Sequence, residues 1–94
     1  MKYGILVHEN EDDVGVAVMD LKAGSEIGAA TLEGNPVNTI KLVDDVPLGH
    51  KVAMRDLAED KHIIEYGQTI GKATEPILCG AHVHIHNLKT LRWS

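Results

Sequence analysis

VGVAVMDL, residues 14–21, is the stretch that decides the fold class. Its three valines alternate with the small residues Gly15 and Ala17. A period of two residues is typical of a half-buried β-strand, because successive side chains of a strand point to opposite faces of the sheet. The stretch then ends in an Asp-Leu pair, which suggests a turn.

The same pattern returns later in the chain. VAMRDL at residues 52–57 matches VAVMDL at residues 16–21 in four of six positions, at an offset of 36 residues, and Ile27 falls on Ile63 at the same offset. Two copies of a strand followed by an Asp-Leu turn suggest a duplicated β unit with pseudo-two-fold symmetry. Short matches also arise by chance, so a fortuitous echo is the alternative.

Strand patterns continue along the whole chain, with glycine-rich turns between them. The expected strands cover residues 2–8, 14–21, 27–32, 37–43, 50–54, 62–67, 68–74 and 81–87. A spacing of roughly 8–12 residues is typical of an all-β sandwich or barrel-like unit. We therefore predict a mainly β, small, compact, strand-rich single domain over residues 1–94. Helix is restricted to short turns, with one expected near Asp56–Asp60.

Composition excludes several classes of protein. A net charge of −5 over 94 residues argues against a nucleic-acid-binding protein, which needs a basic surface. No apolar run approaches the roughly 20 residues that cross a bilayer, and the N-terminus lacks the pattern of a signal peptide. The single cysteine, Cys79, cannot form an intramolecular disulfide and is expected to act as a small buried hydrophobe. We expect a cytoplasmic protein.

Three of the six histidines lie in AHVHIHN near the C-terminus. In a strand, His82, His84 and His86 would line one face, and Val83 and Ile85 the other. Neighbours on that face would be about 6.6–6.8 Å apart at Cα, which allows two rings to converge on one cation. A third ring on the same line would have to reach round a bend.

Three interpretations of this segment remain open. Val83 and Ile85 can face the core while the histidines face water, or the domain can bind a metal unaided. In the third, the histidines meet a substrate or a second polypeptide, where imidazoles exchange protons near pH 7. Asn87, at the end of the segment, either binds substrate or shapes a turn.

Two further sites are weaker candidates. His50 and Lys51 directly follow a Pro-Leu-Gly turn, a position that favours function, although a lone exposed histidine is usually incidental. His8 precedes the acidic residues 9–13, which lack the spacing of a calcium loop, so we expect a solvated turn there. The chain by itself contains no complete active site.

As an ordered set, GHK at 49–51, YGQTIG at 66–71 and HVHIHN at 82–87 resemble the SAF domain of the altronate/galactarate dehydratase family. The resemblance covers residues 6–93. It implies a β-clip fold, which in this family is either the N-terminal domain of an enzyme or a separate small subunit. Relatives often have glycine where this chain has Asp60, which affects only the local turn.

The resemblance also implies a function. The chain would be a small accessory subunit of a metal-dependent lyase, capping the active site of a separate large catalytic subunit. The substrate would be an anionic sugar acid of the altronate or galactarate type, for a hydro-lyase, or sulfolactate, for a sulfo-lyase. The expected cofactor is a divalent metal ion, with iron as the first candidate, and it would be held mainly by the large subunit. Metal ligands on this chain stay undecided, and the isolated chain is a candidate for self-association.

The family motifs assign candidate roles to six residues. The catalytic candidates are His82, His84 and His86, and the substrate-binding candidates are His50, Lys51 and Asn87. A basic tail of Lys89, Arg92 and Trp93 would suit an anionic substrate or the rim of an interface, and a frayed tail is the alternative. The alternatives are a free-standing carbohydrate- or protein-binding module without catalytic activity, and a self-sufficient metalloprotein.

Overall fold

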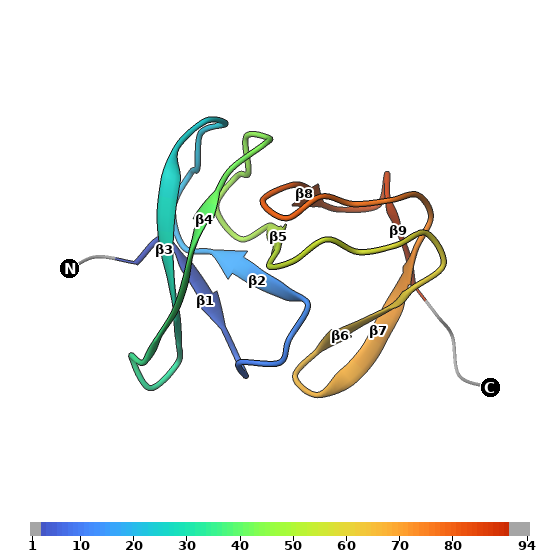
Figure 1. Ribbon diagram of the computed structural model, residues 1–94, viewed down its shortest axis with the longest axis horizontal. Helices are drawn as coiled ribbons and strands as arrows, with labels where there is room; N and C mark the ends of the chain where they lie inside the picture. The colour runs from blue at the N-terminus through green and yellow to red at the C-terminus, as the bar shows by residue number, and fades with distance from the viewer. Residues whose placement is uncertain (1–2, 91–94) are drawn as a thin grey trace.

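The computed structural model describes residues 3–90 as nine strands in two sheets, with no helix in that range (Figure 1). The strands are β1 (Ile5–Val7), β2 (Val14–Ala17), β3 (Glu26–Thr31), β4 (Pro36–Lys41), β5 (Lys51–Ala53), β6 (His62–Glu65), β7 (Gln68–Ala73), β8 (His82–Val83) and β9 (Leu88–Thr90). The larger sheet has the order β4-β3-β1-β2-β5-β8, and the smaller sheet the order β6-β7-β9. The predicted mainly β, strand-rich class is confirmed.

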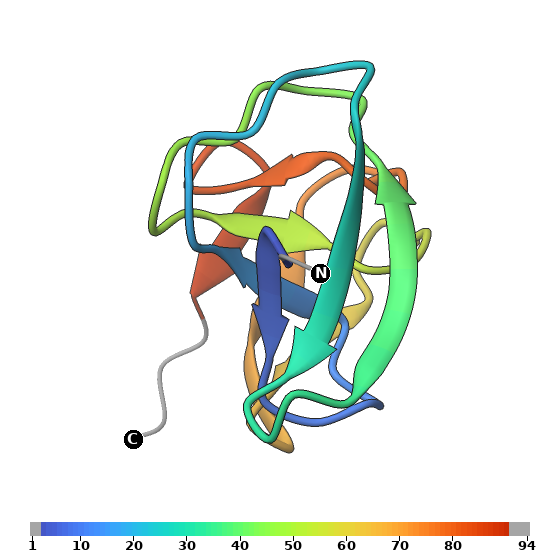
Figure 2. The same cartoon turned by 90° about the vertical axis from the view of Figure 1, so that its left-hand side faces the viewer.

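The larger sheet curls around its own core. Figure 2 shows β3 and β4 crossing β5 and β8 steeply, although all four belong to that sheet. Residues 3–90 contain no helix with the length and apolar character needed to cross a bilayer.

Each expected strand segment contains an observed strand, and two expectations were wrong in detail. The helical turn near Asp56–Asp60 is absent, and Leu57 instead forms an isolated antiparallel bridge with Ile77. The strand expected over residues 81–87 ends after Val83, and the chain turns before β9 begins.

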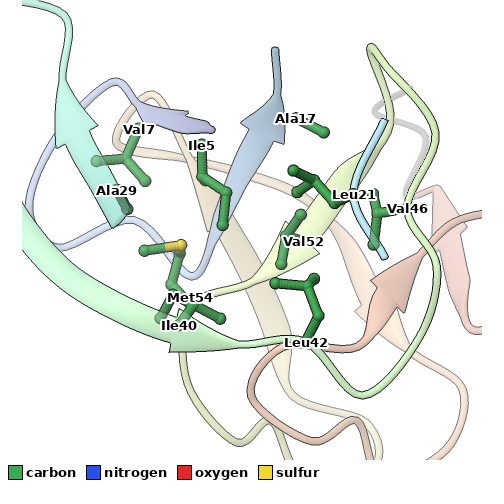
Figure 3. Close-up of a cluster of buried hydrophobic side chains, with 10 residues drawn as sticks. All are labelled: Ile5, Val7, Ala17, Leu21, Ala29, Ile40, Leu42, Val46, Val52 and Met54. Carbon is green, nitrogen blue, oxygen red and sulfur yellow. The ribbon is translucent and has the colours of Figure 1, made fainter. Parts of the chain in front are cut away.

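Two hydrophobic cores share β2 and β5. The first lies within the larger sheet (Figure 3) and consists of Ile5, Val7, Ala17, Leu21, Ala29, Ile40, Leu42, Val46, Val52 and Met54. The second, between the sheets, consists of Val14, Ala53, Leu57, Ile63, Ala73, Ile77, Ala81 and Val83. Val14 and Ala53 face the second core while Val52 faces the first, so this part of the sheet is buried on both sides.

This double burial corrects the expected half-buried strand. Val14, Gly15 and Ala17 are all buried, and Val16 is partly so. A Cβ on Gly15 would lie 2.6 Å from Cγ2 of Ile5, so the small residue is needed for close packing against the first core.

The backbone hydrogen bonds repeat in a way that agrees with the suggested duplication. Leu21 and Val46 exchange both N–H···O bonds, at 2.8 and 2.9 Å, and Leu57 and Ile77 do the same, at 2.7 and 2.8 Å. Leu57 follows Leu21 by the offset of 36, whereas Ile77 follows Val46 by 31. Each pair of reciprocal hydrogen bonds therefore joins two similar turns to each other.

An aspartate side chain supports each pair of turns. Oδ1 of Asp20 accepts the N–H of Leu48 at 2.9 Å, and Oδ1 of Asp56 accepts the N–H of Cys79 at 2.8 Å. The Asp-Leu signature read from the sequence thus marks a side-chain-to-backbone bond that crosses to the opposing turn.

The four turns share one left-handed position. It is occupied by Gly24 (φ 87°), Gly49 (φ 87°), Gly80 (φ 88°) and Asp60 (φ 69°). Glycine adopts this conformation without steric cost, and aspartate tolerates it better than most other residues. Asp60 therefore takes the place of glycine in the third of these turns along the chain.

A matched pair of substitutions tests this assignment. Gly24→Ala should lower the free energy of unfolding by about 1–2 kcal/mol, because a Cβ there meets no atom within 4 Å and only backbone strain is added. Gly80→Ala should cost at least about 2 kcal/mol more, since its Cβ would overlap the carbonyl oxygen of Lys41. Urea unfolding measures both, and equal losses would contradict the close approach at Gly80.

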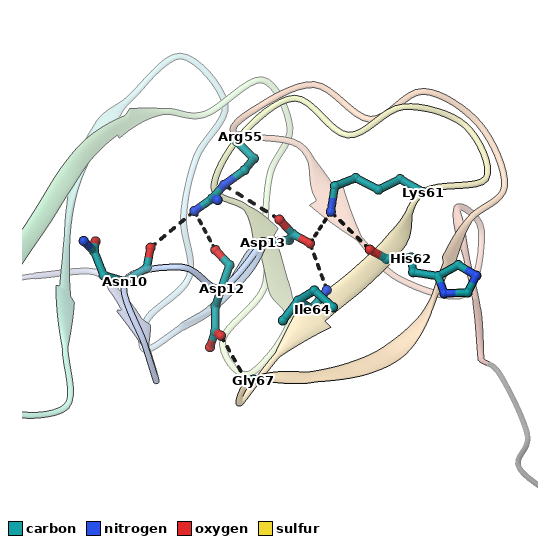
Figure 4. Close-up of polar contacts among 8 residues, drawn as sticks. All are labelled: Asn10, Asp12, Asp13, Arg55, Lys61, His62, Ile64 and Gly67. Atoms are coloured by element: carbon teal, nitrogen blue, oxygen red, sulfur yellow. Dashed lines mark hydrogen bonds and ion pairs between the residues drawn. The ribbon is translucent and has the colours of Figure 1, made fainter.

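Asp13 ties the two sheets together (Figure 4). Its backbone N–H donates to the carbonyl of Ile64 in β6 at 2.8 Å, and its carbonyl accepts the N–H of Met54 at 2.8 Å. Its carboxylate accepts the N–H of Ile64 at 2.9 Å and the ammonium of Lys61 at 2.6 Å. Nε of Arg55 lies 3.8 Å from the other carboxylate oxygen.

The solvated acidic turn expected at residues 9–13 is wrong for its last two residues. Asp12 is 1% exposed and Asp13 is 3% exposed, whereas residues 9–11 are exposed. Oδ2 of Asp12 accepts the N–H of Tyr66 at 3.0 Å. Buried carboxylates of this kind need donors, and β6 with the turn after it supplies them.

Asp13→Ala should lower the free energy of unfolding by about 2–3 kcal/mol, because the partly buried N–H of Ile64 and the ammonium of Lys61 lose their acceptor and Arg55 loses its ion-pair partner. Glu11→Ala, an exposed change in the same turn, is the matched control and should cost under about 0.5 kcal/mol. Denaturant unfolding gives both values. A loss at Asp13 no larger than that at Glu11 would show that the carboxylate does not hold the sheets together.

Candidate functional site

Three histidine rings converge on the surface of the larger sheet. The ligand nitrogens of His50, His82 and His84 all lie within 4.8 Å of one another. Nδ1 of His50 is 2.8 Å from Nε2 of His82, a hydrogen bond between the rings. The ring centroids of His50 and His84 lie 4.6 Å apart, and those of His82 and His84 lie 5.5 Å apart. We call these three residues the histidine trio.

The fold positions the trio from two neighbouring turns. His50 follows Gly49 in the turn that leads into β5, and its N–H closes that turn on the carbonyl of Pro47 at 3.0 Å. His82 begins β8, where it pairs with Val52 of β5, and its N–H donates to Oδ2 of Asp44 at 3.0 Å. The pairing of β5 with β8 thus brings together residues 32 positions apart.

Asn87 holds the chain reversal that carries His84. Its side-chain oxygen accepts the N–H of His84, and its side-chain nitrogen donates to the carbonyl of His82, both at 2.9 Å. The N–H of Leu88 then donates to the carbonyl of His84 at 2.9 Å. Asn87 is only 5% exposed, so its amide shapes this turn, and direct contact with substrate stays a prediction.

The reversal corrects the expected alternation of faces. Val83 faces the core at 1% exposed, as the pattern predicted, but Ile85 is 85% exposed and contributes nothing to either core. His86 lies on the turn, and its ring centroid is 5.5 Å from that of His82. The imidazoles of His82 and His84 therefore gather because the chain bends after β8. The third ring of the trio comes from His50, in the turn before β5, and not from the same strand.

His82 is biased toward its neutral form. Burial lowers its pKa below the usual range, and the neighbouring His50, His86 and His84 lower it further, while Asp44 acts in the opposite direction. A neutral imidazole keeps a lone pair for a proton or a metal ion.

A groove of about 350 Å³ lies beside the trio. It is lined by Gly49, His50, Lys51, Val83, His84, Ile85, Leu88 and Thr90. The ammonium of Lys51 lines this groove together with the imidazoles of His50 and His84, so an anionic group bound there could contact all three. His50 and Lys51, the predicted substrate-binding pair, therefore line the same groove as His84.

Sequence reasoning missed Glu65. This buried carboxylate lies 3.8 Å from Nζ of Lys51, and burial raises its pKa while the Lys51 ammonium opposes that rise. Glu65 also lines a second groove of about 180 Å³ together with His8 and Tyr66, whose ring centroids lie 4.3 Å apart in a tilted arrangement. His8 thus lies apart from the trio. Only the unbroken strand pattern of HIIE hinted that Glu65 would be buried.

Lys51→Met should raise the pKa of Glu65 further, because the ammonium is the strongest influence that lowers it. A raised pKa means that protonated Glu65 favours folding, so its stabilisation is lost as the pH rises through that value. Carboxyl-detected NMR titration measures the change. Lys72→Met is the control, since Lys72 pairs with the exposed Asp60 at 3.5 Å, and an equal shift there would contradict the assignment.

Cys79 is partly buried and packs against the first core, in line with its expected role as a small hydrophobe. Burial raises the pKa of its thiol, which disfavours the reactive thiolate. Arg92 and Trp93 of the expected basic tail lie outside the described residues.

Comparisons with known proteins agree with these motifs. The altronate/galactarate dehydratase SAF domain family matches residues 2–91. The (2R)-sulfolactate sulfo-lyase subunit alpha of Chromohalobacter salexigens is 39% identical over 99% of this chain and 100% of its own length. The altronate dehydratase of Bacillus subtilis is 36% identical over 96% of this chain, which spans only 17% of that longer protein. The subunit alpha from Paracoccus pantotrophus is 47% identical over 52% of this chain and 73% of its own length.

Proposed function

Because this chain belongs to the altronate/galactarate dehydratase SAF domain family, we propose that it is the small accessory subunit of a metal-dependent lyase. In this proposal it caps the active site of a separate large catalytic subunit in the cytoplasm. The reaction is an elimination from an anionic hydroxy acid, either loss of sulfite from sulfolactate or loss of water from an altronate- or galactarate-type sugar acid.

The end-to-end match carries this proposal. The sulfo-lyase relative named as subunit alpha corresponds to this chain over its full length. In the altronate dehydratase relative, the same region is one part of a much longer protein. A domain found both as a subunit and as a part of a larger enzyme is best explained if it completes a site that lies mostly elsewhere.

The chemistry of elimination suits the side chains around the histidine trio. A base removes the proton α to the carboxylate, and an acid protonates or stabilises the leaving group. The candidates for proton transfer are His82, His84 and His86, because imidazole is the side chain best suited in general to exchange protons near pH 7. His50 and Lys51 would bind the anionic groups of the substrate, while Asn87 holds the turn in place.

The surface around these residues suits a partner. Ile85 lines the groove beside the trio, and Leu78 lines another groove with His86 and Asn87. Both hydrophobic side chains are exposed in the isolated chain. Covering them with the large subunit would exclude water from the reaction, and an isolated chain would cover them by self-association.

The divalent metal expected for this family, with iron first, would stabilise negative charge on the substrate carboxylate when bound. In this proposal the large subunit supplies most of its ligands. The residues of this chain would bind and orient the substrate and exchange its protons.

Co-expression with a large lyase subunit from the same genome tests the assembly. We expect a stable complex in size-exclusion chromatography, with elimination activity on sulfolactate, altronate or galactarate assayed in parallel. A chain that forms no complex and leaves the activity of the large subunit unchanged would instead be a free-standing carbohydrate- or protein-binding module.

In that complex, His84→Ala should lower kcat by about 100-fold or more, as expected for loss of a general acid or base. His84 is exposed, so the variant should remain folded. The matched control is His62→Ala, an exposed histidine on β6 that should leave kcat within about twofold. Unchanged turnover of the His84 variant would remove its catalytic role while leaving the subunit assignment intact.

A further inference from the structure

We propose that His50, His82 and His84 form a binding site for one divalent transition-metal ion on this chain alone. The inference is independent of the lyase assignment, because every ligand comes from the described residues of this chain. While the ion is bound, the ligating nitrogens of His82 and His84 cannot transfer protons. Metal binding is therefore an alternative to their proton-transfer role, and it leaves His86 as the free imidazole among the three proton-transfer candidates.

The spacing of the donor atoms suits such an ion. A metal bound to imidazoles at 2.0–2.1 Å in tetrahedral geometry places its nitrogens about 3.3 Å apart. In the trio, the closest nitrogens are 2.8 Å apart and all lie within 4.8 Å of one another. Small rotations of the side chains would bring three nitrogens to the required separation.

The backbone holds all three ligands before any ion binds. His50 is fixed by the Gly49 turn, His82 by its pairing with β5, and His84 by the amide of Asn87. Such preorganisation reduces the conformational entropy that binding would otherwise cost. A flexible histidine-rich surface lacks this property.

The donor set also selects the class of metal. Three imidazoles and no carboxylate favour Zn²⁺, Co²⁺, Ni²⁺ or Fe²⁺ over Ca²⁺ and Mg²⁺, which prefer oxygen. Three protein ligands leave at least one position open, and His50 and His84 both line the groove that contains Lys51. A carboxylate or hydroxyl of an anionic ligand entering that groove would fit the open position, with His86 outside the ligand set as a free imidazole.

Titration of the full chain, prepared without a histidine tag and stripped of metal, tests the site. Co²⁺ should bind with one equivalent and produce visible absorption bands typical of four or five ligands, and Zn²⁺ should abolish them. His50→Ala, His82→Ala and His84→Ala should each weaken binding at least about tenfold, since even residues that only support metal ligands contribute 10–100-fold. His86→Ala and His62→Ala are the matched controls and should stay within about threefold.

Two outcomes would overturn the proposal. One is the absence of saturable binding up to millimolar Co²⁺. The other is a loss in His86→Ala or His62→Ala as large as that in His84→Ala, which would indicate diffuse binding by surface histidines. Amide NMR spectra verify folding of the His82 variant, and the exposed His84 provides a variant that does not disturb the core. Failure to assemble with a large subunit would not affect these measurements.

Discussion

The carboxylate of Asp13 is the interaction on which the arrangement of the two sheets depends. β2 and β5 belong to the larger sheet, yet each also forms one wall of the core between the sheets. At their ends, Asp13 bonds to Met54 after β5 and to Ile64 in β6, and its charge is balanced by Lys61. An acidic residue is buried here because the backbone needs an acceptor where one sheet stops and the other begins.

Periodicity predicted the strands well, because alternation of large and small apolar residues is a local property. It could not show that β2 is buried on both faces, since that requires β6 and β7 to pack against it. The duplicated Asp-Leu turn was also visible in the sequence, at residues 16–21 and 52–57. Its function was not, because the bonds of Asp20 and Asp56 reach turns that lie more than 20 residues away.

In the candidate site, too, local patterns were predictable and long-range contacts were not. Three closely spaced histidines identified the region, and family motifs added His50 and Lys51. The geometry came from elsewhere: Asn87 reverses the chain after β8, and the β5–β8 pairing brings His50 to His82. Glu65 gave only a weak local signal, the strand pattern of HIIE, because its burial depends on how the smaller sheet packs. Contacts of this long range cannot be read from spacing along one strand.

The turn from His84 to Asn87 is held by hydrogen bonds at its two ends, and its two middle residues are exposed. Bonds between His84 and Asn87 fix the ends, whereas Ile85 and His86 are exposed between them. Replacements at these two positions would alter the shape and polarity presented to another molecule without weakening either core. Such a segment can accept new side chains on an unchanged scaffold, which makes it a convenient place to graft new recognition chemistry.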